Sequence, residues 1–235
     1  MVWKITPLFA EWIAAEGNVL FRSGLIGRGS TVLELGCGVS GILALSMSEK
    51  VGSYVATDLD YVFKLLRKNL EENVIQTKKD KKGNRHRKGG SKAFETVRDS
   101  NITVMALDWV TSSISLLPSL LGDDHINGAT AIDAVIACDC IYNEALMEPF
   151  VLTCADICRL AKSDPSGIPT MCIVAQQLRS DTVFEAWLSA FCKEFRVWRF
   201  PDELLIAGLK EGTGFVVHVG ILRDCDDTRS SIIGF

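Results

Sequence analysis

Residues Thr31 to Gly41 have the sequence TVLELGCGVSG, a short apolar run that leads directly into a glycine-rich turn. An apolar run bounded by glycine predicts a buried strand, and Ile42 to Met47 after the turn is expected to be helical. The turn satisfies G-x-G-x-x-G through Gly36, Gly38 and Gly41. Glycines between a strand and a helix let the backbone approach a ligand closely, so this stretch predicts a site for an adenosine-type cofactor.

A second strand and helix follow, at Tyr54 to Asp58 and at Tyr61 to Asn73. Asp58 ends its strand 22 residues after Gly36, where a carboxylate can accept hydrogen bonds from both hydroxyls of a ribose. The alternative is a glycine-rich turn with no ligand, and the spacing of Asp58 disfavours it.

The alternation of strands and helices continues along the chain. Further strands are expected at 102–107, 134–138, 171–175, 195–199 and 215–222, and further helices at 7–20, 149–161 and 181–191. Successive βα units form parallel sheets. We therefore expect one α/β domain over residues 1–235, with a Rossmann-like, doubly wound sheet of seven strands. The sheet should be mostly parallel with an antiparallel C-terminal strand, and helices should cover both of its faces.

Charge is segregated along the chain. The insert at 76–92 contains no apolar residue between Lys78 and Lys92, and that stretch carries a net charge of +7. Because the whole chain carries −4, the remainder carries −11, which argues against a general electrostatic grip on nucleic acid. The insert is expected to be a disordered loop, with docking onto RNA, an acidic partner or an import receptor left open.

Eight cysteines lie mostly inside apolar runs, which is typical of reduced thiols in a reducing compartment. No C-x-x-C pair is present and the three histidines are scattered, so no metal site is expected. No window reaches the roughly 18 apolar residues of a spanning helix, and the first residues do not resemble a signal peptide. We expect a monomer without membrane contact, located in the cytoplasm and also in the nucleus.

The identity of the cofactor depends on Glu34. A dinucleotide-binding fold usually has an apolar residue two positions before the first glycine, whereas a carboxylate there can orient the turn around a cationic methionine group. The chain also lacks a separate substrate domain or a Tyr-x-x-x-Lys arrangement, which a dehydrogenase would need. S-adenosylmethionine is therefore favoured over NAD.

A second polar feature follows the strand at 134–138. Asp139 ends this apolar run, and Tyr142 lies in the loop after it. The carboxyl ends of parallel strands face the ligand cleft, and a buried carboxylate needs a partner. Asp139 should therefore either cap the next helix or meet a cationic or amide group in the cleft.

Taken in order, these motifs resemble the seven-strand protein lysine methyltransferases, which carry D-x-x-Y after the fourth strand. The resemblance spans nearly the whole chain, and residues 142–150 and 38–43 are similar to the fungal ribosomal-protein lysine methyltransferase 5 group. Proteins of this type usually have a further segment before the position of Trp3. The residues that carry the resemblance are Trp3, Glu34 to Gly38, Asp58, Asn73, Asp108, Trp109, Asp139 and Tyr142 to Glu144.

The resemblance implies a role for each of these positions. Asp139 and Tyr142 would line the lysine entrance as catalytic residues, with Asp139 holding the amine and Tyr142 packing on it. The implied cofactor-binding residues are Trp3, Glu34, Gly36, Gly38, Asp58, Asp108, Trp109 and Cys138. The implied partner is a protein with a methylatable lysine, a ribosomal or other translation-related protein.

Two other functions stay open at this point. Enzymes that methylate adenine N6 also place an aromatic residue after an Asp at this strand end, although their Asp-Pro-Pro-Tyr differs from Asp139-Cys140-Ile141-Tyr142. The second is a non-catalytic adaptor, which would bind the cofactor and dock through the basic loop. The presence of Glu34, Asp58, Asp139 and Tyr142 argues against lost catalysis.

Overall fold

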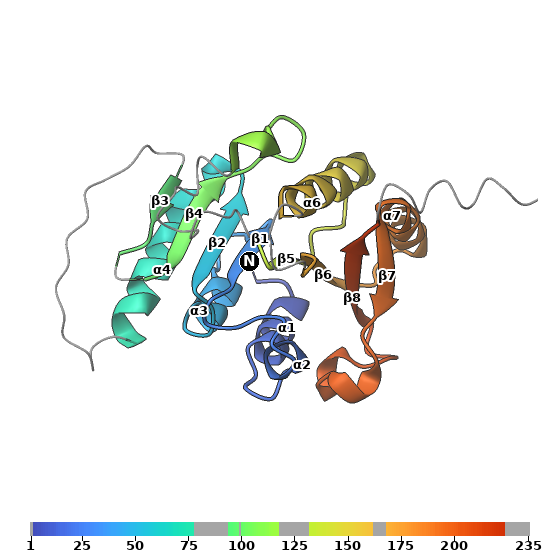
Figure 1. Ribbon diagram of the computed structural model, residues 1–235, viewed down its shortest axis with the longest axis horizontal. Coiled ribbons are helices and arrows are strands. Elements are labelled where there is room, and N and C mark those ends of the chain that lie inside the picture. Colours follow the sequence, from blue (N-terminus) through green and yellow to red (C-terminus); the bar gives the residue numbers. More distant parts are fainter. Residues whose placement is uncertain (1, 78–93, 99, 118–131, 162–167, 224–235) are drawn as a thin grey trace, which may run out of the picture.

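An eight-stranded sheet forms the centre of the computed structural model, which describes residues 2–77, 94–98, 100–117, 132–161 and 168–223 (Figure 1). The strand order is β3-β4-β2-β1-β5-β6-β8-β7. The strands are β1 Thr31–Leu35, β2 Ser53–Asp58, β3 Phe94–Thr96, β4 Ile102–Ala106, β5 Ala134–Cys138, β6 Met171–Gln177, β7 Phe195–Arg199 and β8 Phe215–Leu222.

Strand β1 lies at the point where the strand order reverses. It pairs in parallel with β2 on one side and with β5 on the other. The crossovers from β1 to β2 and onward to β5 run in opposite directions from this centre, so the carboxyl ends of β1, β2 and β5 meet at one edge. Ligands of open α/β sheets bind at such a switch point. The topology therefore places the glycine turn, Asp58 and Asp139 at the same edge.

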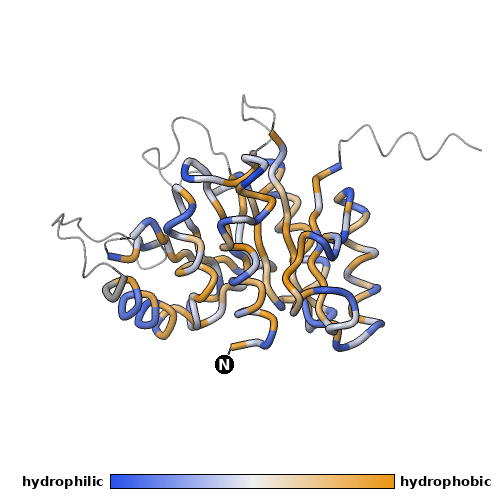
Figure 2. Tube along the Cα trace, turned by 90° about the horizontal axis from the view of Figure 1, so that it is seen from below, coloured by the Kyte–Doolittle hydropathy of each residue, from blue (hydrophilic) through white to orange (hydrophobic). Residues whose placement is uncertain are grey.

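Helices cover both faces of the sheet (Figure 1). One face packs against α1 (Ile5–Ile13), α2 (Val19–Arg22), α3 (Ile42–Ser48) and α4 (Phe63–Thr77), and the other packs against α6 (Met147–Ala161) and α7 (Asp181–Glu194). Alternate residues of β1 supply the two cores: Val32 faces the first, and Leu33 and Leu35 face the second. Figure 2 shows the strands through the middle of the molecule coloured mainly as hydrophobic. A strand buried on both faces explains why residues 31–35 are almost entirely apolar.

The predicted fold class is confirmed, with one correction to the number of strands. The sheet has eight strands instead of seven, because the short edge strand β3 pairs antiparallel with β4. Strand β8 runs antiparallel to both β6 and β7, in agreement with the predicted antiparallel C-terminal strand. Three residues at a sheet edge are too few to give a hydrophobic pattern, which is why β3 could not be seen in the sequence.

The helix predicted over 7–20 is two helices. The chain leaves α1 after Ile13, and Asn18 starts α2 by accepting a hydrogen bond from the Leu20 N–H at 2.9 Å. The Asn18 side chain also donates to the Trp12 carbonyl at 2.8 Å, so it ties the two helices together. Asparagine prefers such a cap to a helix interior, which explains the break.

Among the residues that the structure describes, seven cysteines are free thiols, and all except Cys192 are buried. This agrees with the prediction of reduced, core-forming cysteines. No group of three metal-ligating side chains occurs in the described ranges. The helices of the described part are all too short or too polar to cross a membrane. Residues 78–92 of the basic insert lie outside the described residues, and 76 and 77 belong to α4.

Candidate active site

The glycine turn after β1 has the backbone geometry of a ligand cradle. Gly36, Gly38 and Gly41 all have a φ near +65°, a conformation that residues with a β-carbon rarely adopt. A β-carbon on Gly36 would lie 2.7 Å from the Cys140 Sγ and 3.3 Å from the Trp109 ring. At Gly38, no described atom lies within 4 Å of the same position. The turn is therefore packed from beneath at Gly36 and open on its outer side at Gly38.

Asp58 lies directly beside this open part of the turn. Its Oδ2 accepts a hydrogen bond from the Gly38 N–H at 2.8 Å, and its Oδ1 accepts one from the Leu59 N–H at 2.7 Å. Burial raises the pKa of the Asp58 carboxyl group, and the two N–H donors partly offset this effect. The Asp58 carboxylate is thus fixed at the end of β2 with further lone pairs left for a ligand hydroxyl.

Glu34 is placed below the turn, in the core. Its side chain is 3% exposed, and its Oε2 accepts a hydrogen bond from the hydroxyl of the fully buried Tyr54 at 2.8 Å. Burial raises the pKa of Glu34 to about 8; the Tyr54 hydrogen bond opposes this shift and the charge of Asp58 adds to it. A cation bound above the turn would favour the ionised form of Glu34. Its predicted contact with the cofactor stays a prediction.

The loop after β4 carries the predicted pair Asp108 and Trp109, and only Trp109 approaches the turn. Its ring packs edge-on against Phe150 of α6, with 5.1 Å between centroids, and a β-carbon on Gly36 would lie 3.3 Å from it. The Asp108 carboxylate accepts a hydrogen bond from the Val110 N–H at 2.8 Å, which lowers its pKa. The hydrogen bonds of Asp108 are therefore made within its own loop, to Val110 and Ser112.

Among the residues that the structure describes, Asp139 is the one non-glycine residue with a positive φ, which is 59°. Its side chain is 1% exposed. Arg179, two residues beyond β6, donates to both carboxylate oxygens at 2.8 and 2.5 Å, and the Gln177 N–H donates to Oδ1 at 3.3 Å. The sequence predicted a cap or a cationic or amide partner for Asp139, and the structure has the cation and the amide.

Trp3 joins this cluster from the N-terminal end of the chain. Its ring is 48% exposed, and the Arg179 Cζ lies 5.1 Å from the ring centroid in a cation–π contact. The predicted cofactor residue Trp3 and the predicted catalytic residue Asp139 are thus connected through Arg179. Sequence reasoning missed Arg179, although a basic residue just after a predicted strand of the same edge was an available signal.

Tyr142 lies at the rim of the cleft and is 64% exposed. Its pKa is raised by partial burial and by the neighbouring Cys140, Tyr61 and Asp58. Its phenol is therefore protonated and free to pack on an incoming group. The predicted residue Cys138 is buried at the end of β5, where its thiol lies 3.7 Å from the Thr6 hydroxyl of α1.

These residues form two adjoining half-sites on one sheet edge. The first, around Gly38 and Asp58, offers a glycine cradle and a fixed carboxylate. The second, around Asp139 and Tyr142, offers a carboxylate that is paired with the Arg179 guanidinium, and an exposed phenol. The residues of the first half-site fit an adenosine-type cofactor. The Asp58 carboxylate lies beside Gly38, and no described atom fills the space next to this glycine.

The chain is similar in sequence to proteins that are named as lysine methyltransferases. No protein-family model matches the chain. The ribosomal lysine N-methyltransferase 5 of Zygosaccharomyces rouxii is 29% identical over 218 residues, which cover 84% of this chain and 65% of that protein. The protein of the same name from Vanderwaltozyma polyspora is 27% identical over 232 residues, covering 87% and 70%. The chain thus spans about two thirds of the length of these relatives.

Among solved structures, the S-adenosylmethionine-dependent methyltransferase SibL matches 93% of this chain and 56% of its own with a TM-score of 0.52. The sequence identity is 13%, so this likeness concerns the fold. The resemblance found in the sequence is confirmed by the curated relatives. The chain is thus similar in sequence to the ribosomal lysine N-methyltransferase 5 proteins and shares its fold with an S-adenosylmethionine-dependent methyltransferase.

Proposed function

We propose that this protein transfers a methyl group from S-adenosylmethionine to a lysine side chain of a ribosomal or other translation-related protein. The observation that carries the proposal is the shared sheet edge of two half-sites, the Gly38–Asp58 cradle and the Asp139–Tyr142 pair. The names of the curated relatives support the substrate class. The proposed locations are the cytoplasm and the nucleus, and the proposed state is a monomer.

In this proposal, Gly36, Gly38, Asp58 and Trp109 hold the cofactor, which supplies an electrophilic methyl group on a sulfonium when bound. Asp58 would bind the ribose hydroxyls through lone pairs left by the Gly38 and Leu59 N–H groups. Trp109 would limit the space over Gly36, and Trp3 would cover the site from the side of α1.

The substrate amine must reach the methyl group as a neutral lone pair, whereas free lysine has a pKa near 10.4. Asp139 can accept a hydrogen bond from the amine at Oδ2, which is bonded to Arg179 alone and keeps a second lone pair, whereas Oδ1 accepts from both Arg179 and the Gln177 N–H. The Arg179 cation next to this carboxylate disfavours a second positive charge, so it favours the neutral amine.

This geometry assigns Asp139 to orientation of the amine and gives no support to proton abstraction by it. Both oxygens of this carboxylate already accept hydrogen bonds from the Arg179 guanidinium, which holds the side chain in one orientation. The released proton would pass to solvent through the open rim at Tyr142, whose exposed ring can pack on the lysine stem. Alignment of the amine with the methyl group would supply most of the rate.

The proposal is tested with labelled S-adenosylmethionine and a fungal extract, with and without RNase treatment, followed by mass spectrometry of the labelled product. We expect label on lysine in a protein, unaffected by RNase. Label in RNA would contradict the substrate class. Asp139→Ala should abolish incorporation while cofactor binding remains measurable by calorimetry, and equal methylation by this variant would contradict the role of Asp139.

A further inference from the structure

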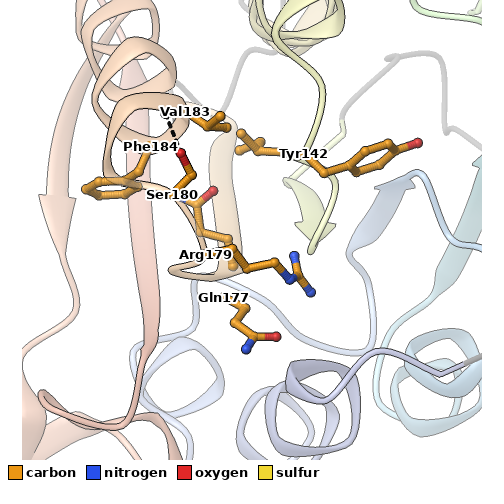
Figure 3. Close-up of a pocket in the computed structure, with 8 residues that line it drawn as sticks. Tyr142, Gln177, Arg179, Ser180, Val183 and Phe184 are labelled. Atoms are coloured by element: carbon orange, nitrogen blue, oxygen red, sulfur yellow. Dashed lines mark hydrogen bonds between the residues drawn. The ribbon is translucent and has the colours of Figure 1, made fainter.

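A small pocket of about 90 Å³ adjoins the lysine half-site (Figure 3). It lies between the loop after β5, the end of β6 and the first turn of α7. Figure 3 shows Val183 and Phe184 at the start of α7, Ser180 and Arg179 just before it, and Tyr142 across from them on the loop after β5, with its ring directed away from α7. Because Tyr142 also borders the lysine entrance, a chain that places a lysine there can place a neighbouring residue in this pocket.

Gln176 is the unexplained polar group in the wall of this pocket. Its side chain is 3% exposed, and among the described residues its amide nitrogen has no hydrogen-bond partner. A buried amide without a partner is unusual in a folded protein and needs an explanation. The terminal torsion of a glutamine side chain is broad, so this carboxamide can turn toward the pocket at little cost.

The start of α7 adds a second polar feature. Ser180 caps this 14-residue helix, and its hydroxyl accepts a hydrogen bond from the Val183 N–H at 3.5 Å (dashed line in Figure 3). The N–H groups of a first helical turn favour an oxygen acceptor nearby. Asp181 follows on the exposed side of the helix and is not part of the pocket wall.

The remaining walls define the size and charge of a ligand. Ile141, Val183 and Phe184 are apolar and suit a short aliphatic stem. The Arg179 charge is compensated by Asp139, so the pocket has no free charge with which to hold an ion. A carboxamide matches these walls, since it can donate to and accept from Gln176 at the same time.

We infer that this pocket binds the carboxamide side chain of an asparagine or glutamine next to the methylated lysine of the protein substrate. This inference rests on the proposed function and extends it to a sequence preference. Gln176 is the specificity-determining residue, through a paired amide–amide hydrogen bond. Tyr142 and the apolar wall position the stem.

A binding experiment tests the pocket without methyl transfer. The ¹⁵N-labelled full chain is titrated with N-acetyl-asparagine N-methylamide and, as a same-sized apolar control, N-acetyl-leucine N-methylamide. Gln176→Met identifies the side-chain NH₂ signal of Gln176 by its loss. We expect the asparagine probe alone to shift this signal in a saturable way. Absence of a shift, or an equal shift with the leucine probe, would overturn the inference.

A second experiment measures the sequence preference with peptide libraries that contain one central lysine and Asn or Leu at each flanking position. One hydrogen bond is worth about fivefold in kcat/KM, so the wild type should prefer Asn by about fivefold at one position. Gln176→Met should lose this preference while its cofactor affinity and melting temperature stay unchanged.

Gln177→Met is the matched control. Gln177 also borders the pocket, but its side chain is half-buried and points away from α7 in Figure 3, so the same chemical change is made outside the proposed contact. It should keep the preference for Asn. An unaltered preference in Gln176→Met, or a loss in Gln177→Met alone, would overturn the assignment to Gln176. If no peptide is methylated by any variant, the proposed function fails, and the titration still decides the pocket.

Discussion

Both carboxylate oxygens of Asp139 accept hydrogen bonds from the guanidinium of Arg179, 40 residues further along the chain. This pair links the segments that follow the neighbouring strands β5 and β6, and it explains how a carboxylate that is 1% exposed is accommodated. Arg179 in turn stacks on Trp3, so the pair also fixes the N-terminal end of the chain beside the site.

The coupling between these two residues can be measured with a double-mutant cycle. Arg179→Leu leaves a buried carboxylate without its cation, which costs about 3–5 kcal/mol in fully buried pairs. Because the Arg179 side chain is 37% exposed, we expect about 1–3 kcal/mol here. Asp139→Asn should cost less, since asparagine tolerates a positive φ and Arg179 can reach water.

Urea unfolding of the two single variants and the double variant provides the measurement. The double variant should be more stable than the sum of the single effects predicts, by about 1 kcal/mol or more. Strict additivity would mean that the two side chains do not interact energetically.

Asp58→Asn tests the cofactor half-site. Asparagine keeps the size of the side chain and one acceptor for the Gly38 N–H, but it removes the charge that would bind ribose hydroxyls. Hydrogen bonds to a charged group are worth about 1.5–3 kcal/mol, so the dissociation constant of S-adenosylmethionine should rise about 10- to 100-fold by calorimetry. The exposed neighbour Asp60 supplies the control, and Asp60→Asn should bind normally. An unchanged affinity in Asp58→Asn would remove Asp58 from the site.

Much of the fold could be predicted because its signals are local. The strands at 31–35 and 134–138 were predicted with their observed bounds, since buried parallel strands are continuous apolar runs that end in glycine or a polar residue. The edge strand β3 and the break at Asn18 were missed. A three-residue strand has no period, and the break depends on a side chain that caps one helix while it binds the carbonyl of another.

The sequence indicated where the site residues lie, but it indicated less well which side chains contact one another. Strand ends identify which residues share an edge, and Asp58 and Asp139 indeed lie there. The position of Arg179 after a strand of the same edge was a signal, but its pairing with Asp139, like that of Tyr54 with Glu34, depends on how distant segments are placed in space. Glu34 is the clearest example. Its carboxyl group accepts a hydrogen bond from Tyr54 within the core, and the residues next to Glu34 in sequence do not indicate this contact.

Gly36 and Gly38 of the turn should respond differently to substitution by alanine. A positive φ costs about 1–2 kcal/mol for a residue with a β-carbon, and Gly36→Ala and Gly38→Ala share this cost. Only Gly36→Ala adds a contact of 2.7 Å with the Cys140 sulfur. Gly36→Ala should therefore be the less stable variant in urea unfolding.

Adding Cys140→Ala to Gly36→Ala should recover part of the loss by removing the obstructing sulfur. Cys140→Ala alone is the control for the cavity that this change creates. Gly38→Ala should instead weaken cofactor binding, because its new methyl group would project into the open side of the turn. Equal stability of the two alanine variants would contradict the packing described beneath Gly36.

The raised pKa of Glu34 predicts a specific dependence of the free energy of unfolding on pH. Its folded pKa of about 8 lies above its ordinary value of 4.5, mainly because of burial. Below pH 4.5 both states hold the proton, so Glu34 contributes no pH dependence. Between pH 4.5 and 8 the unfolded state releases the proton and the folded state keeps it, so the free energy of unfolding falls as pH rises. Above pH 8 the loss is complete, on the order of a few kcal/mol.

His218 acts in the opposite sense over part of this range. Burial lowers its folded pKa to about 4, with a further effect from Arg199, so between pH 4 and 6.5 the unfolded state binds the extra proton and stability rises with pH. The contribution of Glu34 is therefore most clearly seen between pH 6.5 and 8. Urea unfolding across pH 5–8.5 should show a decline in the wild type over that interval.

Glu34→Gln removes the ionisable group and keeps an acceptor for the Tyr54 hydroxyl. In this variant the decline between pH 6.5 and 8 should disappear, and above pH 8 the variant should be the more stable protein. Saturation with S-adenosylmethionine should also reduce the decline in the wild type, because a nearby cation stabilises the ionised carboxylate. If the wild type and Glu34→Gln show parallel pH profiles, Glu34 is already ionised in the folded protein at neutral pH, and burial does not control its charge.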